Sequence, residues 1–339
     1  MRVDLHTHIL PRTWPDLRER FGYGGWVRMV PEPDGCSAAL MIDDRHFRTV
    51  EANCWDPAVR LEQADRAGVD VQVLSTVPVM FAYWAKPADA LVLARILNDH
   101  IAGVCADHPG RFLGLGTVPM QDAGLAVAEL DRCVTELGLR GVQIGTHVNS
   151  LNLGEPELRP VFEAAAELGA AVFVHPWDML ARERMERYWM AWLVGMPAES
   201  SIAICSLLLS GLLERLPALR LAFAHGGGAF PGTVGRIQRG FEVRPDLVAV
   251  DSTVSPLDYL ARDGRPAQIY VDSLVHDPAA LRLLIELFGA ERVALGSDYP
   301  FPLGESEPGA LIASLGLPAV AEARLLAGTA LEFLGMEAA

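Results

Sequence analysis

Eight short apolar segments recur along this chain, and amphipathic helical patterns separate most of them. Most segments are near-continuous in Val, Ile, Leu and Ala, which is typical of strands buried on both faces of a parallel sheet. Eight strand–helix units in 339 residues predict an α/β fold, a (β/α)8 TIM barrel that spans residues 1–339 as a single domain. The predicted strands are Val3–Leu5, Val69–Thr76, Phe112–Val118, Gly141–Thr146, Ala170–His175, Leu219–His225, Gln268–Asp272 and Arg292–Ser297.

Helix boundary signals support this alternation. Asp56 and Pro57 are residue types of an N-cap and a first helical position, and that helix runs toward Gly68. Other glycines stand at predicted C-terminal caps, namely Gly138, Gly169 and Gly289. Apolar residues three and four apart predict further helices over Pro87–Asp107, Ala123–Leu137, Glu157–Leu168, Ala198–Arg215 and Pro278–Phe288.

Two long segments interrupt the alternation. Residues 11–55, rich in Pro, Gly and aromatic side chains, predict a small insertion after the first strand, with a hairpin around Ala38–Val50. The second segment, Trp177–Pro197, follows the fifth strand. Both leave C-terminal strand ends, where barrel enzymes carry their chemistry, so both are expected to cover the mouth of the barrel.

The net charge and the cysteine content limit the possible partners and cellular compartment of this protein. A net charge of -15 argues against nucleic acid and anionic membrane surfaces as partners, because nothing would offset phosphate repulsion. The five cysteines are scattered and form no Cys-x-x-Cys pair, which predicts reduced thiols and a cytoplasmic location. The N-terminus lacks a signal-peptide apolar region, and no apolar run is expected to reach the roughly 18 residues of a membrane span.

Residues with metal or acid/base chemistry stand at the C-terminal ends of four predicted strands. The first strand gives His6 and His8, whose spacing of two places both on one side of a strand. The fifth and sixth give His175 and His225, and the eighth gives Asp298. Each alone has an ordinary explanation, as a surface or hydrogen-bonded histidine or as a capping aspartate. Together they would converge on one pocket and predict a metal site.

The chemistry of such a site follows from its ligand types. Imidazoles bind a divalent ion at about 2.0–2.1 Å, and zinc is the ion most often held this way. The ligand set also admits manganese or cobalt. A bound ion lowers the pKa of its water from about 15.7 toward about 7. His225, beside that water, would take or return the proton, and a further metal ligand is its alternative role.

The same residues resemble the amidohydrolase superfamily, and longer stretches resemble its aminocarboxymuconate-semialdehyde decarboxylase family. The matching segments cover nearly the whole chain and are long enough to be specific. The segment Arg28–Arg45 and the tail after Gly309 match least. The matching segments are Phe21–Trp26, Asn53–Pro57, Ser75–Phe81, Val142–His147, Val174–Met179, Trp192–Glu199, His225–Phe230 and Gly296–Glu305.

The resemblance implies a fixed set of roles at the strand ends. One zinc ion per subunit would be held by His6, His8, His175 and Asp298, with a water completing the shell and His225 as the acid/base group beside it. Members of the superfamily with two metals bridge them through a carboxylated lysine on the fourth strand. The fourth predicted strand contains no lysine here, so a single metal is expected.

The implied reaction is non-oxidative decarboxylation of 2-amino-3-carboxymuconate-6-semialdehyde to 2-aminomuconate-6-semialdehyde and CO2, in tryptophan degradation by the kynurenine route, upstream of the branch to quinolinate. Two mechanisms stay open. One is hydroxide addition assisted by His225, and the other is direct protonation of the carbon bearing the departing carboxylate, with Asp298 or the metal-bound water as acid. A hydroxybenzoate decarboxylase of the same superfamily is the alternative function, followed by a metal-dependent amide or lactone hydrolase. A metal-binding protein without catalysis is disfavoured.

Arginines are expected to bind the carboxylates of this small-molecule substrate, because a guanidinium makes two parallel hydrogen bonds to a carboxylate. The resemblance assigns this role to Arg48 and to Arg236, the latter donated by the neighbouring subunit of a homodimer. A flat apolar pocket is expected between aromatic and sulfur side chains, with core packing as the competing explanation: Trp177, Met179, Trp192 and Phe301. Another strand-end histidine, His147, is a weaker site candidate. The histidines expected to be structural or exposed are His46, His100, His108 and His276.

Overall fold

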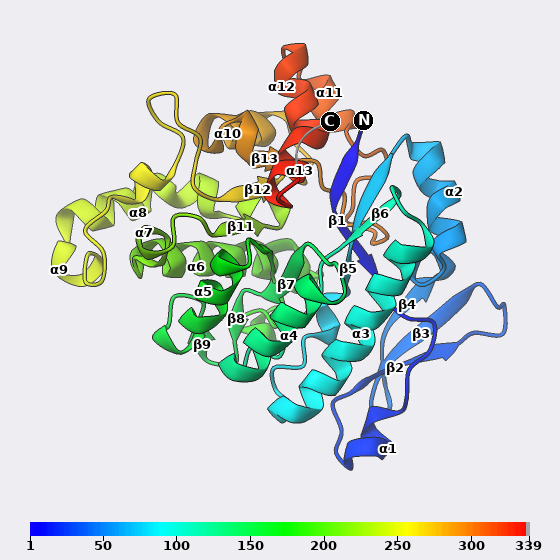
Figure 1. Cartoon of the computed structure of the whole chain (residues 1–339). Helices are drawn as coiled ribbons and strands as arrows, with labels where there is room; N and C mark the ends of the chain where they lie inside the picture. The colour runs from blue at the N-terminus through cyan, green and yellow to red at the C-terminus, as the bar shows by residue number, and fades with distance from the viewer. Residues whose placement is uncertain (337–339) are drawn as a thin grey trace.

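Eight parallel strands form the centre of the computed structural model, which describes residues 1–336 (Figure 1). Residues 337–339 of the predicted single domain lie outside this described part. The strands are β1 Val3–Ile9, β5 Val71–Thr76, β6 Phe112–Gly114, β7 Gly141–Gly145, β10 Ala171–His175, β11 Arg220–Phe223, β12 Tyr270–Asp272 and β13 Val293–Ala294. They form two hydrogen-bonded sheets, in the orders β1-β5-β6 and β13-β12-β11-β10-β7.

The two sheets meet at both of their edges. On one side Gly116, just after β6, bridges to Val142 of β7 in parallel register. On the other side the Leu5 N–H donates to the Leu295 carbonyl at 2.8 Å, which joins β1 to the segment after β13. The eight strands therefore run round a cylinder, and the predicted (β/α)8 barrel is confirmed.

Helices connect the strands on the outside of the cylinder (Figure 1). Two predicted helices occur with the predicted bounds, as α3 (Pro87–Asp107) and α10 (Pro278–Phe288). The Asp56 side chain accepts a hydrogen bond from the Ala58 N–H and caps the N-terminus of α2 (Pro57–Ala67), as its position in the sequence predicts. The other helices indicated by apolar spacing are α2 Pro57–Ala67, α4 Ala123–Thr135, α5 Arg159–Glu167, α6 Met196–Leu209 and α7 Leu212–Arg215.

The spacing predicts no helix after β11 or after β13, and the structure contains helices in both places. The longest, α8 (Phe230–Val243), holds a proline and three glycines, which lower helix propensity. Phe230 and Val234 are buried in the main core, so tertiary packing stabilises this helix. The remaining helices are α9 Pro245–Val248, α11 Ala310–Ser314, α12 Ala319–Ala323 and α13 Thr329–Phe333.

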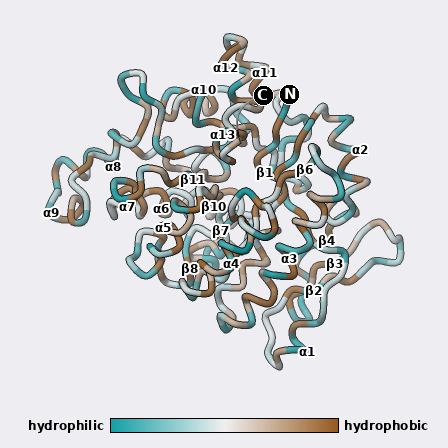
Figure 2. Tube along the Cα trace, viewed as in Figure 1, coloured by the Kyte–Doolittle hydropathy of each residue, from teal (hydrophilic) through white to brown (hydrophobic). Residues whose placement is uncertain are grey.

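Apolar side chains fill the interior of the cylinder. Leu5, Phe173, Ala222 and Ala294, from four different strands, are fully buried in one cluster. A larger cluster lies between the strands and the helices, and Figure 2 shows hydrophobic stretches running through the centre of the fold. Full burial of a side chain such as Phe173 contributes about 1.5–3 kcal/mol. This packed interior is a rigid base for the residues at the strand ends.

A small antiparallel sheet stands beside the barrel (Figure 1), and its strands lie between β1 and α2 in the sequence. The predicted hairpin is present as its second and third strands, and a first strand that the sequence did not indicate pairs with the second. Trp26 and Val50 are buried in a cluster with Val79, which follows β5, so the sheet is packed against the barrel. The strands of this sheet are β2 Val27–Pro31, β3 Ser37–Ile42 and β4 Arg45–Glu51, and the short helix α1 Leu17–Phe21 precedes them. A separate two-stranded sheet is formed by β8 His147–Val148 and β9 Leu151–Asn152.

One helical run within residues 1–336, Ala191–Leu209, is long and apolar enough to cross a membrane by length and composition, with a hydropathy of 1.5. The expectation that no segment reaches this length was therefore wrong. One such helix is weak evidence for a membrane span, because core helices pass the same test. In this fold 44% of the window is buried, including Glu199 and Leu207.

Candidate metal centre and active site

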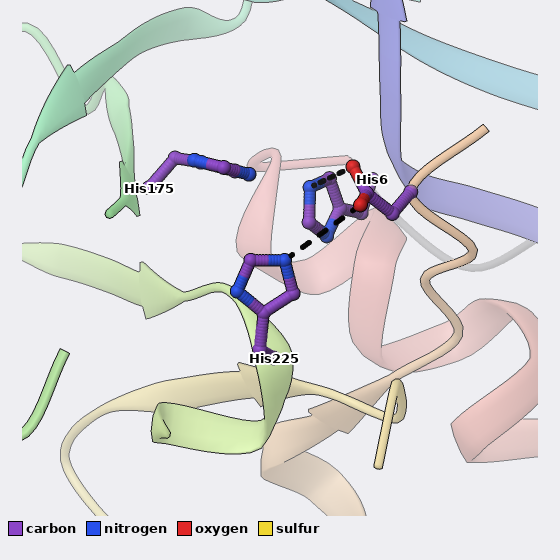
Figure 3. Close-up of side chains that lie close together, drawn as sticks. His6, His175 and His225 are labelled. Atoms are coloured by element: carbon purple, nitrogen blue, oxygen red, sulfur yellow. Dashed lines mark ion pairs between the residues drawn. The ribbon is translucent and has the colours of Figure 1, made fainter. Parts of the chain in front are cut away.

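Five side chains from four strand ends meet at one point. His6, His175 and His225 point toward one another from β1, β10 and the end of β11 (Figure 3). Together with Asp298 they form a group whose ligand atoms all lie within 4.8 Å of one another. His8 lies at the same place, with its Nε2 3.1 Å from His6 Nε2 and 3.0 Å from Asp298 Oδ1. The structure thus brings together the five strand-end residues that the sequence predicts to form a metal site.

A β-bulge in β1 brings both N-terminal histidines into the cluster. One extra residue stands between Asp4 and Thr7, so that Leu5 and His6 both lie opposite a single residue of β5. In a regular strand the inward side chain of Leu5 would send His6 and His8 to the outer face. The extra residue reverses the alternation, which is the usual effect of a bulge near an active site.

Three of the histidines are held in one orientation by hydrogen bonds on the outer side of the ring. In each, Nδ1 faces an oxygen that accepts, so Nδ1 carries the proton and Nε2 keeps its lone pair. The pairs are His6 Nδ1 with Asp272 Oδ2 (2.7 Å), His8 Nδ1 with the Thr76 carbonyl (3.0 Å) and His175 Nδ1 with the Pro176 carbonyl (2.9 Å). All three Nε2 lone pairs are therefore available at the cluster.

This arrangement fits a divalent ion. The Nε2 atoms of His6 and His8 lie 3.1 Å apart, so either a metal ion lies beside both of them or a proton is shared between them. His175 Nε2 is buried and has no hydrogen-bond partner within residues 1–336, and Asp298 Oδ1 lies 3.0 Å from His8 Nε2. Buried polar atoms are nearly always paired, and imidazole nitrogens with a carboxylate form a common ligand set for zinc and manganese. The cluster is therefore a metal site made of histidine and aspartate.

Burial and neighbouring groups set protonation states that suit metal binding. Burial, reinforced by the neighbouring histidines, lowers the pKa of His175 well below its usual value. Burial also lowers the pKa of His8. Burial raises the pKa of Asp298, but hydrogen bonds and positive charge from the histidines outweigh it and hold that pKa well below its usual range. Burial lowers the pKa of His6 too, but its hydrogen bond to Asp272 and the charge of Asp298 outweigh burial and raise that pKa. Neutral imidazoles and an ionised carboxylate are the forms that bind a metal, so a metal competes with a proton at His6.

His225 differs from the other three histidines. It follows β11 in a left-handed backbone conformation, with φ at 57°, and its ring is part-exposed at the cluster. Its Nε2 lies 3.9 Å from Asp298 Oδ2. Among the described residues, no hydrogen bond to its Nδ1 fixes the ring. A part-exposed imidazole without a fixed tautomer, beside the metal ligands, can exchange protons with a bound molecule.

Asp272, at the end of β12, is a site residue that the sequence reading missed. It is fully buried and accepts hydrogen bonds from the His6 ring and from the His225 backbone. Burial raises its pKa, but the hydrogen bond and positive charge from His6 outweigh this and lower it. The signal was present in the sequence, because the seventh predicted strand ends at this acidic residue just as the eighth leads to Asp298.

A cavity of about 400 Å³ opens beside the cluster, and most of its wall is apolar. Arg48, on β4, enters it from the small sheet. The Arg48 guanidinium carbon lies 4.5 Å from the centre of the Phe301 ring and 5.8 Å from that of Trp192. Burial lowers the pKa of Arg48, and no carboxylate of the described residues forms an ion pair with it. A guanidinium in an aromatic pocket without a counter-ion is suited to bind an anion.

The other predicted pocket residues fall in different places. Trp177, Trp192 and Phe301 line the cavity, together with Trp189 and Leu193 from the same long segment after β10. The wall also includes His276, which is exposed as expected.

Two predicted substrate-binding residues do not line this cavity. Met179 is buried one layer behind it, in a cluster with Ala191 and Met196. Arg236 is exposed on α8. His147 does not line it either, and its Nδ1 and Nε2 contact the carbonyl oxygens of Asn149 and Asp178.

Comparison with known proteins agrees with this fold. Residues 3–336 match the model of the amidohydrolase family. The chain is 54% identical to a 2-amino-3-carboxymuconate-6-semialdehyde decarboxylase from Dictyostelium discoideum, over 99% of this chain and 92% of that protein. It is 41% identical to a protein of the same name from Caenorhabditis elegans, over 92% of this chain and 88% of that one.

Solved structures of decarboxylases share the architecture. The 5-carboxyvanillate decarboxylase of Sphingomonas paucimobilis superposes with a TM-score of 0.81 at 25% identity, over 99% of both chains. A second structure is a dihydroxybenzoic acid decarboxylase from Polaromonas sp. JS666, solved with bound manganese and the inhibitor 2-nitroresorcinol. It superposes with a TM-score of 0.75 at 22% identity, over 98% of this chain and 96% of that one.

The barrel and its histidine–aspartate cluster define a metal-dependent enzyme of the barrel class. The family match over nearly the full length then shows that the chain belongs to the amidohydrolase superfamily. Within that superfamily, its relatives support a decarboxylase, a carbon–carbon lyase that releases CO2.

Proposed function

We propose that this protein converts 2-amino-3-carboxymuconate-6-semialdehyde into 2-aminomuconate-6-semialdehyde and CO2. The observation that carries the proposal is the 54% identity, over 99% of the chain, to a decarboxylase of that name. The apolar cavity beside the metal site, with one buried arginine, suits a flat conjugated carboxylate. A place in tryptophan degradation and a cytoplasmic location belong to the same proposal.

In this proposal one zinc ion is held by His6, His8, His175 and Asp298. The convergence of the histidine Nε2 atoms on Asp298, and the absence of a hydrogen-bond partner for His175 Nε2 within residues 1–336, support these four residues as ligands. When bound, the ion supplies Lewis-acid polarisation and lowers the pKa of a coordinated water toward about 7. Manganese is the alternative ion, because the ligand set admits it and a decarboxylase of the same fold holds it.

Substrate binding is assigned to the cavity wall. Arg48 binds one carboxylate through its guanidinium, which has no competing ion pair among the described residues. Trp177, Trp192 and Phe301 hold the conjugated chain between them and exclude water from it. Arg236 is exposed on α8, so we propose that it reaches the cavity of a second subunit and binds the other carboxylate there.

His225 is assigned the proton transfer. The reaction breaks one carbon–carbon bond to release CO2 and forms one carbon–hydrogen bond at the same substrate carbon, so one proton must be delivered to that carbon. The part-exposed ring of His225, 3.9 Å from Asp298, faces the cavity and lacks a fixed tautomer. A group in this role typically contributes about 10²–10⁴-fold to the rate. Asp298 is the competing proton donor.

A coupled assay tests the function. Incubation of 3-hydroxyanthranilate with its dioxygenase generates the semialdehyde, and adding this protein should speed the loss of its absorbance and release one CO2 per substrate. Chelation should stop turnover, and titration with zinc and with manganese should show which ion restores it. Turnover of 2,6-dihydroxybenzoate without turnover of the semialdehyde would instead establish the hydroxybenzoate alternative.

A further inference from the structure

One buried carboxylate connects the metal ligands to the proposed proton-transfer group. We propose that Asp272 is a positioning residue that fixes His6 and His225 together, so that metal binding and proton transfer depend on the same side chain. This inference rests on the functions proposed above for the two histidines. It is carried by the hydrogen bonds of Asp272 and by the backbone conformation after β11.

Both oxygens of Asp272 are fully used. Oδ2 lies 2.7 Å from His6 Nδ1 and accepts the His225 N–H at 2.9 Å. Oδ1 accepts the N–H of Gly226 at 2.8 Å and that of Leu274 at 3.1 Å. The carboxylate is fully buried, so water does not compete for these bonds. A single side chain therefore holds a metal-ligand ring and two successive backbone N–H groups of the His225 turn.

The hydrogen bond between Asp272 and the His6 ring affects metal binding. Because the carboxylate only accepts, it keeps the His6 proton on Nδ1 and leaves the Nε2 lone pair directed at the cluster. A carboxylate behind a ligating histidine also raises the basicity of that ligand, and its loss typically lowers metal affinity about 10–100-fold.

The hydrogen bonds from the His225 and Gly226 backbone to Asp272 hold the turn that carries the proposed proton-transfer group. His225 has a left-handed conformation, which costs a non-glycine residue roughly 1–3 kcal/mol and persists only where the surroundings enforce it. The two N–H bonds to Asp272 enforce it from one side. Close packing of the turn against Val275 holds this conformation from the other side, since a Cβ added at Gly226 would lie only 2.5 Å from Val275 Cγ1. Asp272 thus fixes the backbone position from which the His225 side chain extends toward the cluster.

The partners of Asp272 distinguish it from a carboxylate that only stabilises the fold. Glu129 is equally buried, but its partners are Asn98 and the guanidinium groups of Arg95 and Arg132, all on α3 and α4. Asp272 has no arginine or lysine partner within residues 1–336, and its only side-chain donor is His6. Its charge is therefore placed to act on the site. Glu129→Gln is the matched control for loss of a buried, hydrogen-bonded carboxylate.

The decisive variant is Asp272→Asn, because an amide offers one accepting oxygen and cannot satisfy both His6 and the backbone donors. We expect zinc affinity, measured by chelator competition without substrate, to fall about 10–100-fold. With zinc raised until the site is filled, kcat should remain about 10²–10⁴-fold below wild type while KM changes less than about threefold. Crystal structures of the zinc-loaded variant and wild type should show the His225 ring displaced. Glu129→Gln should leave all four measurements unchanged.

Two results would overturn the proposal: unchanged zinc affinity, or a kcat that returns to the wild-type value once the site is filled. If Asp272→Asn does not fold, Gly226→Ala replaces it, since the added Cβ displaces the turn and leaves the His6 bond in place. That variant should keep zinc affinity within about threefold of wild type and lose kcat, and an unchanged kcat would equally overturn the proposal. Absence of turnover by the wild type counts against the proposed function alone, because zinc affinity and the His225 position still test Asp272.

Discussion

The Nε2 atoms of His6 and His8 lie 3.1 Å apart, each with its Nδ1 proton committed to an oxygen on the far side of the ring. At this distance in a buried site the two nitrogens are stable together when a metal ion lies beside them or when a proton is shared between them. The relationship depends on the bulge in β1, which turns both rings inward. The metal site is therefore built into the backbone of the first strand.

Replacing His175 should abolish metal binding. Its Nε2 is buried and unpaired within residues 1–336, so His175→Ala removes a ligand without breaking another hydrogen bond to that atom. We expect zinc affinity to fall more than about 100-fold, since even an outer-shell partner is worth 10–100-fold. Zinc content after dialysis, measured by plasma mass spectrometry, checks this. His108→Ala, at the end of α3, is the control and should keep its zinc. Full zinc content in His175→Ala would contradict the ligand assignment.

Replacing Arg48 should weaken substrate binding. A hydrogen bond to a charged group contributes about 1.5–3 kcal/mol, so Arg48→Met should raise KM about 10–150-fold. The KM of Arg48→Lys should lie between those of Arg48→Met and the wild type, because lysine keeps the charge but cannot make two parallel hydrogen bonds to a carboxylate. Arg45→Met, an exposed arginine on the same strand, should have no effect. Steady-state kinetics check this, and equal KM values for Arg48→Met and Arg45→Met would exclude Arg48 from the substrate site.

Much of the barrel and its site followed from local sequence patterns. Apolar runs located the eight strands, and α3 and α10 had the predicted bounds because Pro87 and Pro278 mark their first residues. The strand ends then identified five side chains that the fold brings together.

Features that depend on tertiary contacts were not predictable in this way. Regular alternation gives no sign of the bulge at Leu5 and His6, which forms only when β1 pairs with β5. The glycine-rich start of α8 has poor helix propensity, and packing of Phe230 overrides it. The strand-end position of Asp272 was visible in the sequence, but its partners were not, because it accepts hydrogen bonds from His6 and His225, which are far away in the chain.

Glu199 should make stability depend on pH. Burial raises its pKa above the usual value, although the Leu180 N–H and the charge of His147 oppose this. The folded protein therefore binds this proton more tightly than the unfolded chain, so the ionised carboxylate lowers stability at high pH and ceases to do so as the pH falls through the raised pKa. Glu199→Gln, which keeps an accepting oxygen for Leu180, should raise the Tm by about 1–3 °C at pH 8 and less at pH 4. A Tm gain that grows toward low pH, in thermal unfolding scans, would refute this.

A side chain at position 141 should disrupt the barrel. A Cβ added to Gly141 at the start of β7 would lie 1.9 Å from the carbonyl oxygen of Ala171 on β10, and backbone atoms cannot move aside as a flexible side chain can. We expect Gly141→Ala to cost more than about 3 kcal/mol in the free energy of unfolding. Gly103→Ala, inside α3 with open space around it, should stabilise by up to about 1 kcal/mol. Urea denaturation compares the two, and similar stabilities would argue against a tight β7–β10 contact.

The proposed homodimer gives a complementation experiment. Arg236 is exposed on α8, so a role in catalysis requires the cavity of another subunit. Arg236→Ala and His225→Ala should each be inactive alone. In a mixture, a hybrid dimer has one site with an intact His225 from its own subunit and an intact Arg236 from its partner. Random exchange makes half of the dimers hybrid, with one good site in two, so activity should recover to about a quarter of wild type. Exchange is verified by native mass spectrometry with one variant isotopically labelled. Verified hybrids without activity would show that Arg236 does not act across an interface.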